Sequence, residues 1–195
     1  MNNQNKKGKL IIISAPSGAG KTSLSREIIK RIGPKFNVSK VITYTSRHPR
    51  PGEVNGVDYH FISPEKFKEY AQSGNFLEST NYSDKMYASP SSIESDLNFG
   101  KSFILVLDRE GAKHVAKLIP SSVMIWITVP SIDELKIRME KRGGESPHQI
   151  EKRLEMAEEE IKEEEKQRAF KYHLVNKNFD ESLQDLTAII TQELS

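Results

Sequence analysis

Short apolar runs alternate along the chain with segments in which apolar residues recur every three or four positions. The apolar runs lie at residues 9–14, 101–108, 122–130 and 171–176, and their length and flanking turn residues favour buried strands. Helical patterns follow them at residues 21–32, 110–118, 131–141 and 180–194, the first ending before Gly33 and Pro34. Strands that are apolar on both faces and alternate with helices predict an α/β fold, with a central parallel sheet flanked by helices.

Two segments interrupt this alternation. Residues 43–89 are rich in arginine, tyrosine, glycine and proline, and their pattern predicts a short strand at 59–62 and a helix at 64–72. Residues 142–168 begin with RGGESP and continue as a highly charged helix with one narrow apolar stripe. We expect the acidic run at 158–165 to be a solvent-exposed face of that helix. Both segments are predicted to be lobes on a common core, where binding residues and moving parts concentrate.

We therefore predict a single domain over residues 1–195. Its core comprises residues 8–42, 90–137 and 169–195. One inserted lobe spans residues 43–89, and a second lobe with its following helix spans residues 138–168.

The composition limits the functions that the chain can have. It has 195 residues, of which 36% are hydrophobic and 29% charged, as in a globular protein with a well-charged surface. A net charge of +2 provides no general basic excess for nucleic acid, so any affinity for anions comes from local clusters. Cysteine is absent, which excludes disulfides, thiolate nucleophiles and cysteine-bound zinc. The polar N-terminus and the short apolar runs predict a cytoplasmic protein without a secretory signal or membrane span.

A loop of small residues follows the first predicted strand. Residues 15–22, APSGAGKT, fit the phosphate-binding pattern G-x-x-x-x-G-K-[ST] except at the first position, where Ala15 replaces glycine. In such a loop, backbone N–H groups hold phosphate oxygens, Lys21 bridges the β- and γ-phosphates and the Thr22 hydroxyl binds Mg²⁺. Alanine is tolerated at position 15 if its φ is negative. The predicted nucleotide-binding residues are Ala15, Pro16, Ser17, Gly18, Ala19, Gly20, Lys21 and Thr22.

This loop does not specify the reaction, because GTPases, transport ATPases and small-molecule kinases share it. An ordinary glycine-rich turn is the alternative without a ligand. Information about an acceptor comes from residues 43–89, where Arg47 and Arg50 lie three positions apart and Tyr59, Glu78 and Tyr87 follow. Taken singly, these residues fit equally well as surface arginines, a surface glutamate and core tyrosines.

Taken together, the motifs resemble the guanylate kinase family. The matching stretches are SAPSGAGKT (14–22), SRHPRPGEVNGVDYHF (46–61), GNFLE (74–78), REGA (109–112), PS…EL (130–135), RMEKRGG (138–144), IEKRL (150–154) and VN (175–176). The resemblance covers nearly the whole chain, and the arginine-rich block at 46–61 is specific to the family. It implies a P-loop kinase that transfers the γ-phosphate of ATP to GMP, giving ADP and GDP, with residues 43–89 as the GMP-binding lobe.

The resemblance also implies roles on the acceptor side. The GMP phosphate is largely dianionic near neutral pH, so it needs cationic shielding rather than a general base. Glu78 falls at the family's position for the carboxylate that accepts from the ring N–H and exocyclic amine of guanine, and two hydroxyl groups can donate to its oxo group. The predicted GMP-binding residues are Thr43, Arg47, Arg50, Tyr59, Glu78, Tyr87, Ser89 and Asp108.

Arg138, Arg142 and Arg153 match arginines of the family's mobile lid. The resemblance implies that they close over the triphosphate and stabilise charge on the transferring phosphoryl group, so that with Lys21 they form the predicted catalytic set. The alternative is surface arginines that pair with nearby glutamates. Asn176 matches a family asparagine near the adenine of ATP.

The clearest departure from the family lies in the strand at 101–108. The family's DIDxQG is VLDREG here, so Val106 replaces an aspartate whereas Asp108 is kept. We expect the missing carboxylate to weaken metal affinity or slow the reaction. Mg²⁺ is still expected, held by Thr22 and the substrate phosphates.

Two other functions compete with this interpretation. One is a kinase-dead, guanylate-kinase-like module that binds phosphorylated peptides, which Lys21, Thr22 and the lid arginines disfavour. The other is a kinase for a different phosphorylated acceptor, which Glu78 disfavours. ATP and GMP are the expected partners, with neither nucleic acid nor membrane, and the sequence carries no prediction of the oligomeric state.

Overall fold

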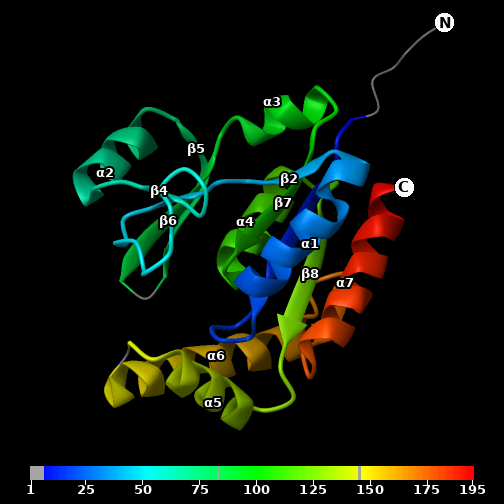
Figure 1. Ribbon diagram of the computed structural model, residues 1–195. Helices are drawn as coiled ribbons and strands as arrows, with labels where there is room; N and C mark the ends of the chain where they lie inside the picture. The colour runs from blue at the N-terminus through cyan, green and yellow to red at the C-terminus, as the bar shows by residue number, and fades with distance from the viewer. Residues whose placement is uncertain (1–6, 83, 145) are drawn as a thin grey trace, which may run out of the picture.

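The computed structural model describes residues 7–82, 84–144 and 146–195, so most of the predicted polar N-terminus lies outside the described residues. Its centre is a five-stranded sheet in which all neighbouring strands are parallel (Figure 1). This confirms the predicted α/β class. The strands, in order across the sheet, are β2 (Val38–Lys40), β7 (Ser102–Leu107), β1 (Leu10–Ser14), β8 (Val123–Thr128) and β9 (Tyr172–Val175).

The two faces of this sheet contribute to two separate hydrophobic cores. Ile11 and Ile13 belong to the core that includes residues of α1 (Lys21–Phe36) and α7 (Phe179–Leu194). Leu10 and Ile12 belong to the other core, with residues of α3 (Ile93–Asn98) and α4 (Arg109–Leu118). Because alternate side chains of a strand point to opposite faces, the fully buried β1 separates the two cores.

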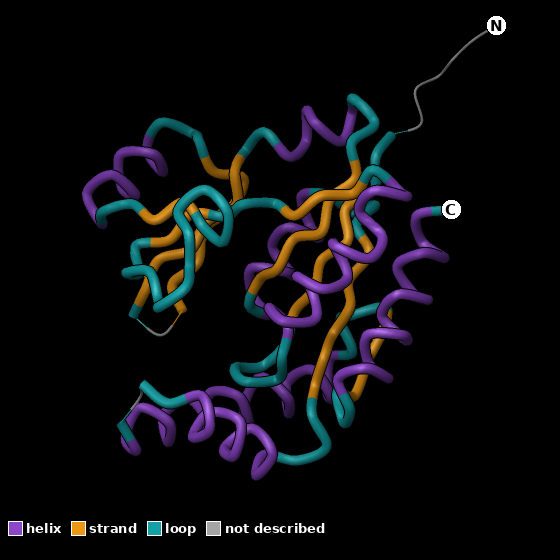
Figure 2. Tube along the Cα trace, in the orientation of Figure 1, coloured by secondary structure: helices purple, strands orange, loops and turns teal. Residues whose placement is uncertain are grey.

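A smaller mixed sheet forms a second group of strands beside the central sheet (Figure 2). Its order is β4 (His60–Phe61), β3 (Tyr44–Thr45), β6 (Lys85–Pro90) and β5 (Phe76–Tyr82). Helix α2 (Pro64–Gln72) packs on this sheet through Phe67, whose ring centroid lies 4.8 Å from that of Phe76. Ser63 begins α2 by accepting a hydrogen bond from the Lys66 N–H, as an N-cap serine does.

Two helices lie side by side at the other end of the molecule, α5 (Ile132–Arg142) and α6 (Pro147–Gln167) (Figure 1). Helix α6 begins with a capping box, in which Ser146 and Gln149 each accept a hydrogen bond from the other's backbone N–H. Leu135 of α5 and Ala157 of α6 are buried in the core beneath α1 and α7. In the described part of the chain, no helix is long and apolar enough to cross a membrane.

The chain returns from α6 to the central sheet through a tight turn. Arg168, with φ of 45°, adopts the left-handed conformation that ends the helix. Phe170 then packs against Trp126 of β8, with ring centroids 5.3 Å apart. This contact joins the end of α6 to the second core, to which both aromatic residues belong.

The strands and helices predicted from the apolar pattern are all present, and α2 matches its prediction residue for residue. The predicted end of the first helix is wrong, because α1 continues through Gly33 and Pro34 to Phe36. Phe36 packs against the core, and this contact outweighs the hydrogen bond that proline cannot donate. The elements that the pattern did not predict are short or largely polar: β2, β3, β5, β6 and α3.

The prediction of a solvent-exposed acidic face at 158–165 is wrong at two positions. Glu164 is only 1% exposed and forms a buried ion pair with Arg109 of α4. Glu160 is partly buried, and its Oε2 atom is inaccessible to solvent. The other glutamates of the run are exposed, as predicted: Glu158, Glu159, Glu163 and Glu165.

Candidate active site

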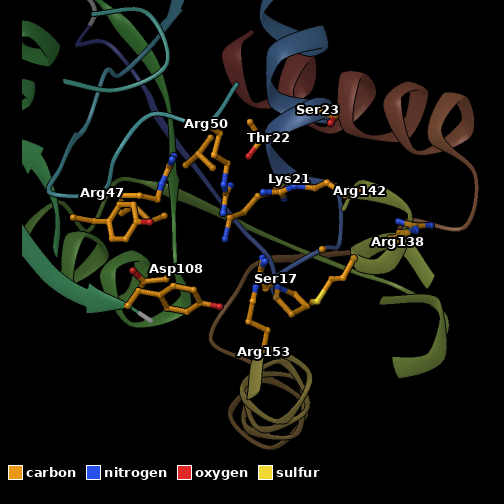
Figure 3. Close-up of a pocket in the computed structure, with 18 of the residues that line it drawn as sticks. Ser17, Lys21, Thr22, Ser23, Arg47, Arg50, Asp108, Arg138, Arg142 and Arg153 are labelled. Carbon is orange, nitrogen blue, oxygen red and sulfur yellow. The ribbon is translucent and has the colours of Figure 1, made fainter. Parts of the chain in front are cut away.

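A pocket lies at the carboxyl ends of β1 and β7, where the central sheet meets the smaller sheet and α5–α6. Ligands of open parallel sheets bind at this end of the strands. Three separate parts of the chain bring positively charged side chains to its wall, with Arg47, Lys21 and Arg138 spread across the view in Figure 3. The lining residues are Pro16, Ser17, Gly18, Gly20, Lys21, Thr22, Ser23, Thr43, Arg47, Arg50, Tyr59, Tyr82, Tyr87, Val106, Leu107, Asp108, Arg138, Met139, Arg142 and Arg153.

Cations dominate this pocket. Five arginines and Lys21 line it, whereas Asp108 is the acidic residue among the described lining residues. The pKa of Arg50 is lowered by burial and then by the positive charges of Arg142, Arg47 and Arg153. Arginines from the segment between β3 and β4 and from α5–α6 therefore act on one another electrostatically across the pocket. A concave site with this excess of positive charge attracts polyanions.

The loop between β1 and α1 has the backbone of a phosphate-binding loop. Gly18 and Gly20 have φ values of 86° and 94°, which favour glycine. Ala15 is not among the described residues with positive φ, so the missing first glycine causes no backbone strain. The Lys21 ammonium donates to the Ala15 carbonyl at 3.1 Å, which holds the lysine along the loop.

Asn176 supports this loop from behind. Its side-chain amide donates to the Ala19 carbonyl at 2.8 Å, and the residue is 3% exposed. A Cβ atom on Gly20 would lie 2.7 Å from the Asn176 Nδ2 atom, so the backbone approaches Asn176 more closely than a side chain allows. Ala15, Ala19 and Asn176 thus shape the loop but are not among the residues that line the pocket.

A lysine, a tyrosine and a glutamate that are far apart in the sequence interact at the base of the loop. Burial lowers the pKa of Lys21, and the negative charges of Glu160 and Asp108 oppose this shift. Burial raises the pKa of Glu160 to about 7, although the charge of Lys21 opposes the rise. The Tyr82 ring lies with its centroid 6.0 Å from the Lys21 Nζ atom, and burial raises the pKa of its phenol. Sequence reasoning missed Glu160 and Tyr82, since neither belongs to a recognisable local motif.

Glu53 determines how Arg47 and Arg50 lie. Its Oε2 and Oε1 atoms accept from Arg47 Nη1 and Nη2 at 2.8 and 3.0 Å, and Oε2 also accepts from the Arg50 backbone N–H at 2.7 Å. The Arg47 guanidinium lies over the Tyr59 ring, 5.4 Å from its centroid. Burial disfavours the charge of Arg47, but the hydrogen bonds and negative charge of Glu53, together with Tyr87, outweigh it, so the pKa of Arg47 is raised. Glu53 belongs to the motif at 46–61 and was not among the predicted site residues.

Glu78 is buried behind the lining residues rather than exposed in the pocket wall. Its side chain is 4% exposed, and its Oε1 atom accepts a hydrogen bond from the Ser89 hydroxyl at 2.7 Å. The Oε2 atom has no hydrogen-bond partner in the described structure. Burial raises the pKa of Glu78 to about 7, and the charge of Asp108 adds to the rise. The Ser89 hydroxyl therefore donates its hydrogen bond to Glu78, whereas Thr43 lines the pocket.

Asp108 stands where β7 ends and α4 begins. It caps α4 by accepting from the Gly111 N–H at 2.8 Å, and it also accepts from the Thr80 hydroxyl of β5 at 2.8 Å. Val106, two residues earlier, lines the same pocket without contributing an oxygen atom. The end of β7 therefore offers one carboxylate to the pocket.

The three predicted lid arginines all reach the pocket. The Arg153 Nε atom donates to the Ser17 hydroxyl at 3.0 Å, and Figure 3 shows this side chain reaching from α6 to the phosphate loop. Arg138 pairs with Glu134 at 2.8 Å and also donates to the Asn176 carbonyl at 2.9 Å. Pairing with a nearby glutamate, the alternative for these arginines, thus occurs at Arg138 without removing it from the pocket.

Comparison with known proteins identifies relatives over nearly the whole chain. A family model described as guanylate kinase matches residues 7–193. A guanylate kinase of Wolbachia pipientis is 36% identical over 95% of this chain and 90% of its own length. One of Clostridioides difficile is 38% identical over 96% of this chain and 89% of its own length. The crystal structure of a guanylate kinase from Anaplasma phagocytophilum superposes with a TM-score of 0.79, at 26% identity, over 97% of this chain and 88% of that one.

Proposed function

The chain belongs to the guanylate kinase family and transfers the γ-phosphate of ATP to GMP, and we propose that the transfer takes place in the cationic pocket between the two sheets and α5–α6. The observation that carries this proposal is the convergence of five arginines and one lysine from three parts of the chain on one phosphate loop. Two polyanionic substrates must meet there, and their mutual repulsion is the main obstacle to the reaction.

ATP binds along the phosphate loop at the start of α1. The backbone N–H groups of residues 15–20 and of the helix N-terminus hold phosphate oxygens, because their dipoles point at the anion. Lys21 leaves the Ala15 carbonyl to bridge the β- and γ-phosphates, which stabilises its charged form. The loop keeps its shape through the Asn176 contact with Ala19. The proposed position of Asn176 near the adenine rests on the family resemblance.

GMP binds with its phosphate against Arg47 and Arg50. Glu53 holds the Arg47 guanidinium in place before the substrate arrives, and Tyr59 and Tyr87 add phenolic donors. The dianionic phosphate is itself the nucleophile, so no side chain is required to remove a proton.

Guanine is recognised by Glu78, with Thr43 donating to the oxo group. The Oε2 atom of Glu78 is free to accept from guanine, whereas its Oε1 atom is held by Ser89. Guanine presents two adjacent donors to this carboxylate, while adenine presents a ring acceptor. A buried carboxylate that faces an acceptor loses its hydrogen bond, so adenine is rejected.

Arg138, Arg142 and Arg153 stabilise the negative charge on the phosphoryl group while it is transferred. Arg47 and Arg138 lie on opposite sides of Lys21 in Figure 3, so we propose that cations surround the transferring group from both directions. Asp108, which follows β7, forms part of the pocket wall on the side where GMP is proposed to bind.

The oxygen donors present fit Mg²⁺. The Thr22 hydroxyl and the Asp108 carboxylate both line the pocket, and Mg²⁺ prefers such hard oxygen ligands together with substrate phosphates. When bound, the ion shields the β- and γ-phosphates. Thr22 would hold the ion together with the substrate phosphates, and Val106 would offer it no side-chain oxygen. We expect turnover to be lost when EDTA removes free Mg²⁺; activity that EDTA leaves undiminished would contradict the requirement for the ion.

One coupled assay tests the proposal. ADP formation from ATP is measured with GMP, AMP, CMP or UMP offered singly, using Lys21→Met as the inactive control. Turnover with GMP alone is expected. Turnover only with a non-guanine acceptor would refute the guanine site, and no turnover with any acceptor would favour the phosphopeptide-binding module. We also infer that the protein acts in the cytoplasm, where its nucleotide substrates are made and used, and that it binds neither nucleic acid nor membrane.

A further inference from the structure

A buried arginine lies directly behind the active site. Arg109 follows Asp108 in the sequence and is only 2% exposed. Its guanidinium is directed at the last turns of α6, where its Nε atom lies 3.3 Å from Glu164 Oε2 and its Nη1 atom 2.8 Å from Glu163 Oε2. Its Nη2 atom donates to Gln167 Oε1 at 2.9 Å. One side chain of α4 thus binds three residues at one end of α6.

Glu164 extends this contact to the central sheet. It is 1% exposed, and its Oε1 atom accepts from the Phe170 backbone N–H at 3.1 Å. The same oxygen lies 2.9 Å from His173 Nε2 of β9. Glu164 therefore connects α6, the segment that follows it and the edge strand of the sheet. The C-terminal end of α6 is held by polar contacts from three directions.

The opposite end of α6 reaches the phosphate loop. Arg153, Glu160 and Glu164 are separated by seven and four positions, so they lie on one face of the helix. Arg153 contacts Ser17, and Glu160 acts on Lys21. By contrast, most of the first two turns of α6 is exposed to solvent. The rotation of this helix about its axis thus decides whether Arg153 faces the loop.

We propose that Arg109 and Glu164 are positioning residues, which hold α6 in the rotation that directs Arg153 at the transferring phosphate. The inference rests on the proposed role of Arg153. A planar guanidinium and a carboxylate fix direction, whereas an apolar contact would bury the same area without fixing it. A buried ion pair often adds little stability compared with apolar residues of similar volume, so orientation is the more specific contribution of this pair.

The test is a double-mutant cycle on the full-length chain. Glu164→Gln is made in the parent and in Arg153→Met, and kcat, the KM for GMP and the thermal unfolding midpoint are measured for all four proteins. Turnover is recorded well below the lowest midpoint. Ile190→Ala, in the buried core of α7, serves as a destabilised control in both backgrounds. If Glu164→Gln does not fold, Arg109→Lys replaces it, since lysine keeps the charge but lacks the planar fork.

A positioning role makes the two sites non-additive in turnover. We expect Glu164→Gln to lower kcat about tenfold in the parent and less than about twofold in Arg153→Met, with the KM for GMP changed less than about twofold. Glu164→Gln should lower the thermal unfolding midpoint by the same amount in the parent and in Arg153→Met. Equal losses of kcat in both backgrounds, or no loss in the parent, would overturn the inference while leaving the proposed function intact. If Arg153→Met alone keeps the parent kcat, the proposed role of Arg153 is what fails.

Discussion

Glu53 holds Arg47 by two parallel hydrogen bonds, Nη1 to Oε2 at 2.8 Å and Nη2 to Oε1 at 3.0 Å. An arginine held in this way is already directed before any ligand binds, so its side-chain entropy is lost during folding rather than during binding. The same carboxylate also accepts from the Arg50 backbone. Glu53 thereby sets the positions of both arginines, although it is not among the residues that line the pocket.

Glu53→Gln is expected to raise the KM for GMP about tenfold, which corresponds to about 1.4 kcal/mol, and to leave the KM for ATP unchanged. The reason is that glutamine replaces a charge-assisted contact by a weaker neutral one. Steady-state kinetics with each substrate varied in turn measures the effect. Glu69→Gln on α2, which removes an exposed ion pair with Lys66, is the matched control. Tighter binding of GMP by Glu53→Gln would mean that Glu53 competes with the phosphate instead of directing Arg47.

The pKa of Glu78, raised by burial to about 7, predicts a pH dependence of GMP use. Only the ionised carboxylate accepts from both guanine donors, so kcat/KM for GMP should rise with pH and level off above about pH 8. At pH 6 the carboxylate is ionised in about a tenth of the molecules, whereas the GMP phosphate, with a second pKa of about 6, is still about half dianionic.

Glu78→Gln separates these two titrations. The variant should lose most of its GMP activity and retain only the shallower step that belongs to the substrate phosphate. Its affinity for ATP, measured by equilibrium binding, should stay within about twofold of the parent value. An unchanged pH profile in the variant would assign the titration near pH 7 to another group, with Glu160 the first to examine because its pKa is also about 7.

Gly20→Ala should weaken ATP binding at least tenfold. At a φ of 94° an L-residue costs about 1–2 kcal/mol, and the new methyl group would stand 2.7 Å from Asn176 Nδ2. The matched change is Ala15→Gly, which restores the usual first glycine of the motif at a position where φ is not positive. We expect that variant to bind ATP within about twofold of the parent, as measured by isothermal titration. A large gain in affinity from Ala15→Gly would show that alanine impairs the loop.

Val106→Asp should lower the Mg²⁺ concentration needed for half-maximal turnover by about two- to tenfold. The new carboxylate would line the pocket two residues before Asp108 and on the same side of β7. Because Val106 also packs against the core, the unfolding free energy should fall by at least about 1 kcal/mol. Val106→Asn introduces the polarity without the charge and should leave the Mg²⁺ dependence nearly unchanged. An equal response of both variants would exclude a role for charge at this position.

The parts of the site that were predictable from the sequence are those that local spacing determines. The phosphate loop needs a strand, a run of small residues and a helix in immediate succession, and all three occur within residues 9–36. The acceptor arginines were recognisable because they belong to one compact motif. Within that motif, Glu53 was not predicted as a site residue, because its contact with Arg47 depends on how the loop turns between the two residues.

Contacts between distant segments were not predictable. Arg109 and Glu164 are 55 positions apart, and each appears in the sequence as one charged residue among many. The acidic run at 158–165 looks uniform, yet the helix turns Glu164 inward to a buried arginine while Glu163 and Glu165 remain exposed. The end of α1 was misjudged for a related reason, because the packing of Phe36 against the core outweighs the local effect of Pro34.

The contact between Trp126 and Phe170 gives the chain an intrinsic optical probe. Trp126 is its single tryptophan, and it is buried against the ring of the residue whose backbone N–H is held by Glu164. Its fluorescence emission therefore reports on the junction between α6 and the sheet without an added dye. Rapid-mixing fluorescence can then follow, in real time, whether that junction stays fixed when substrates bind.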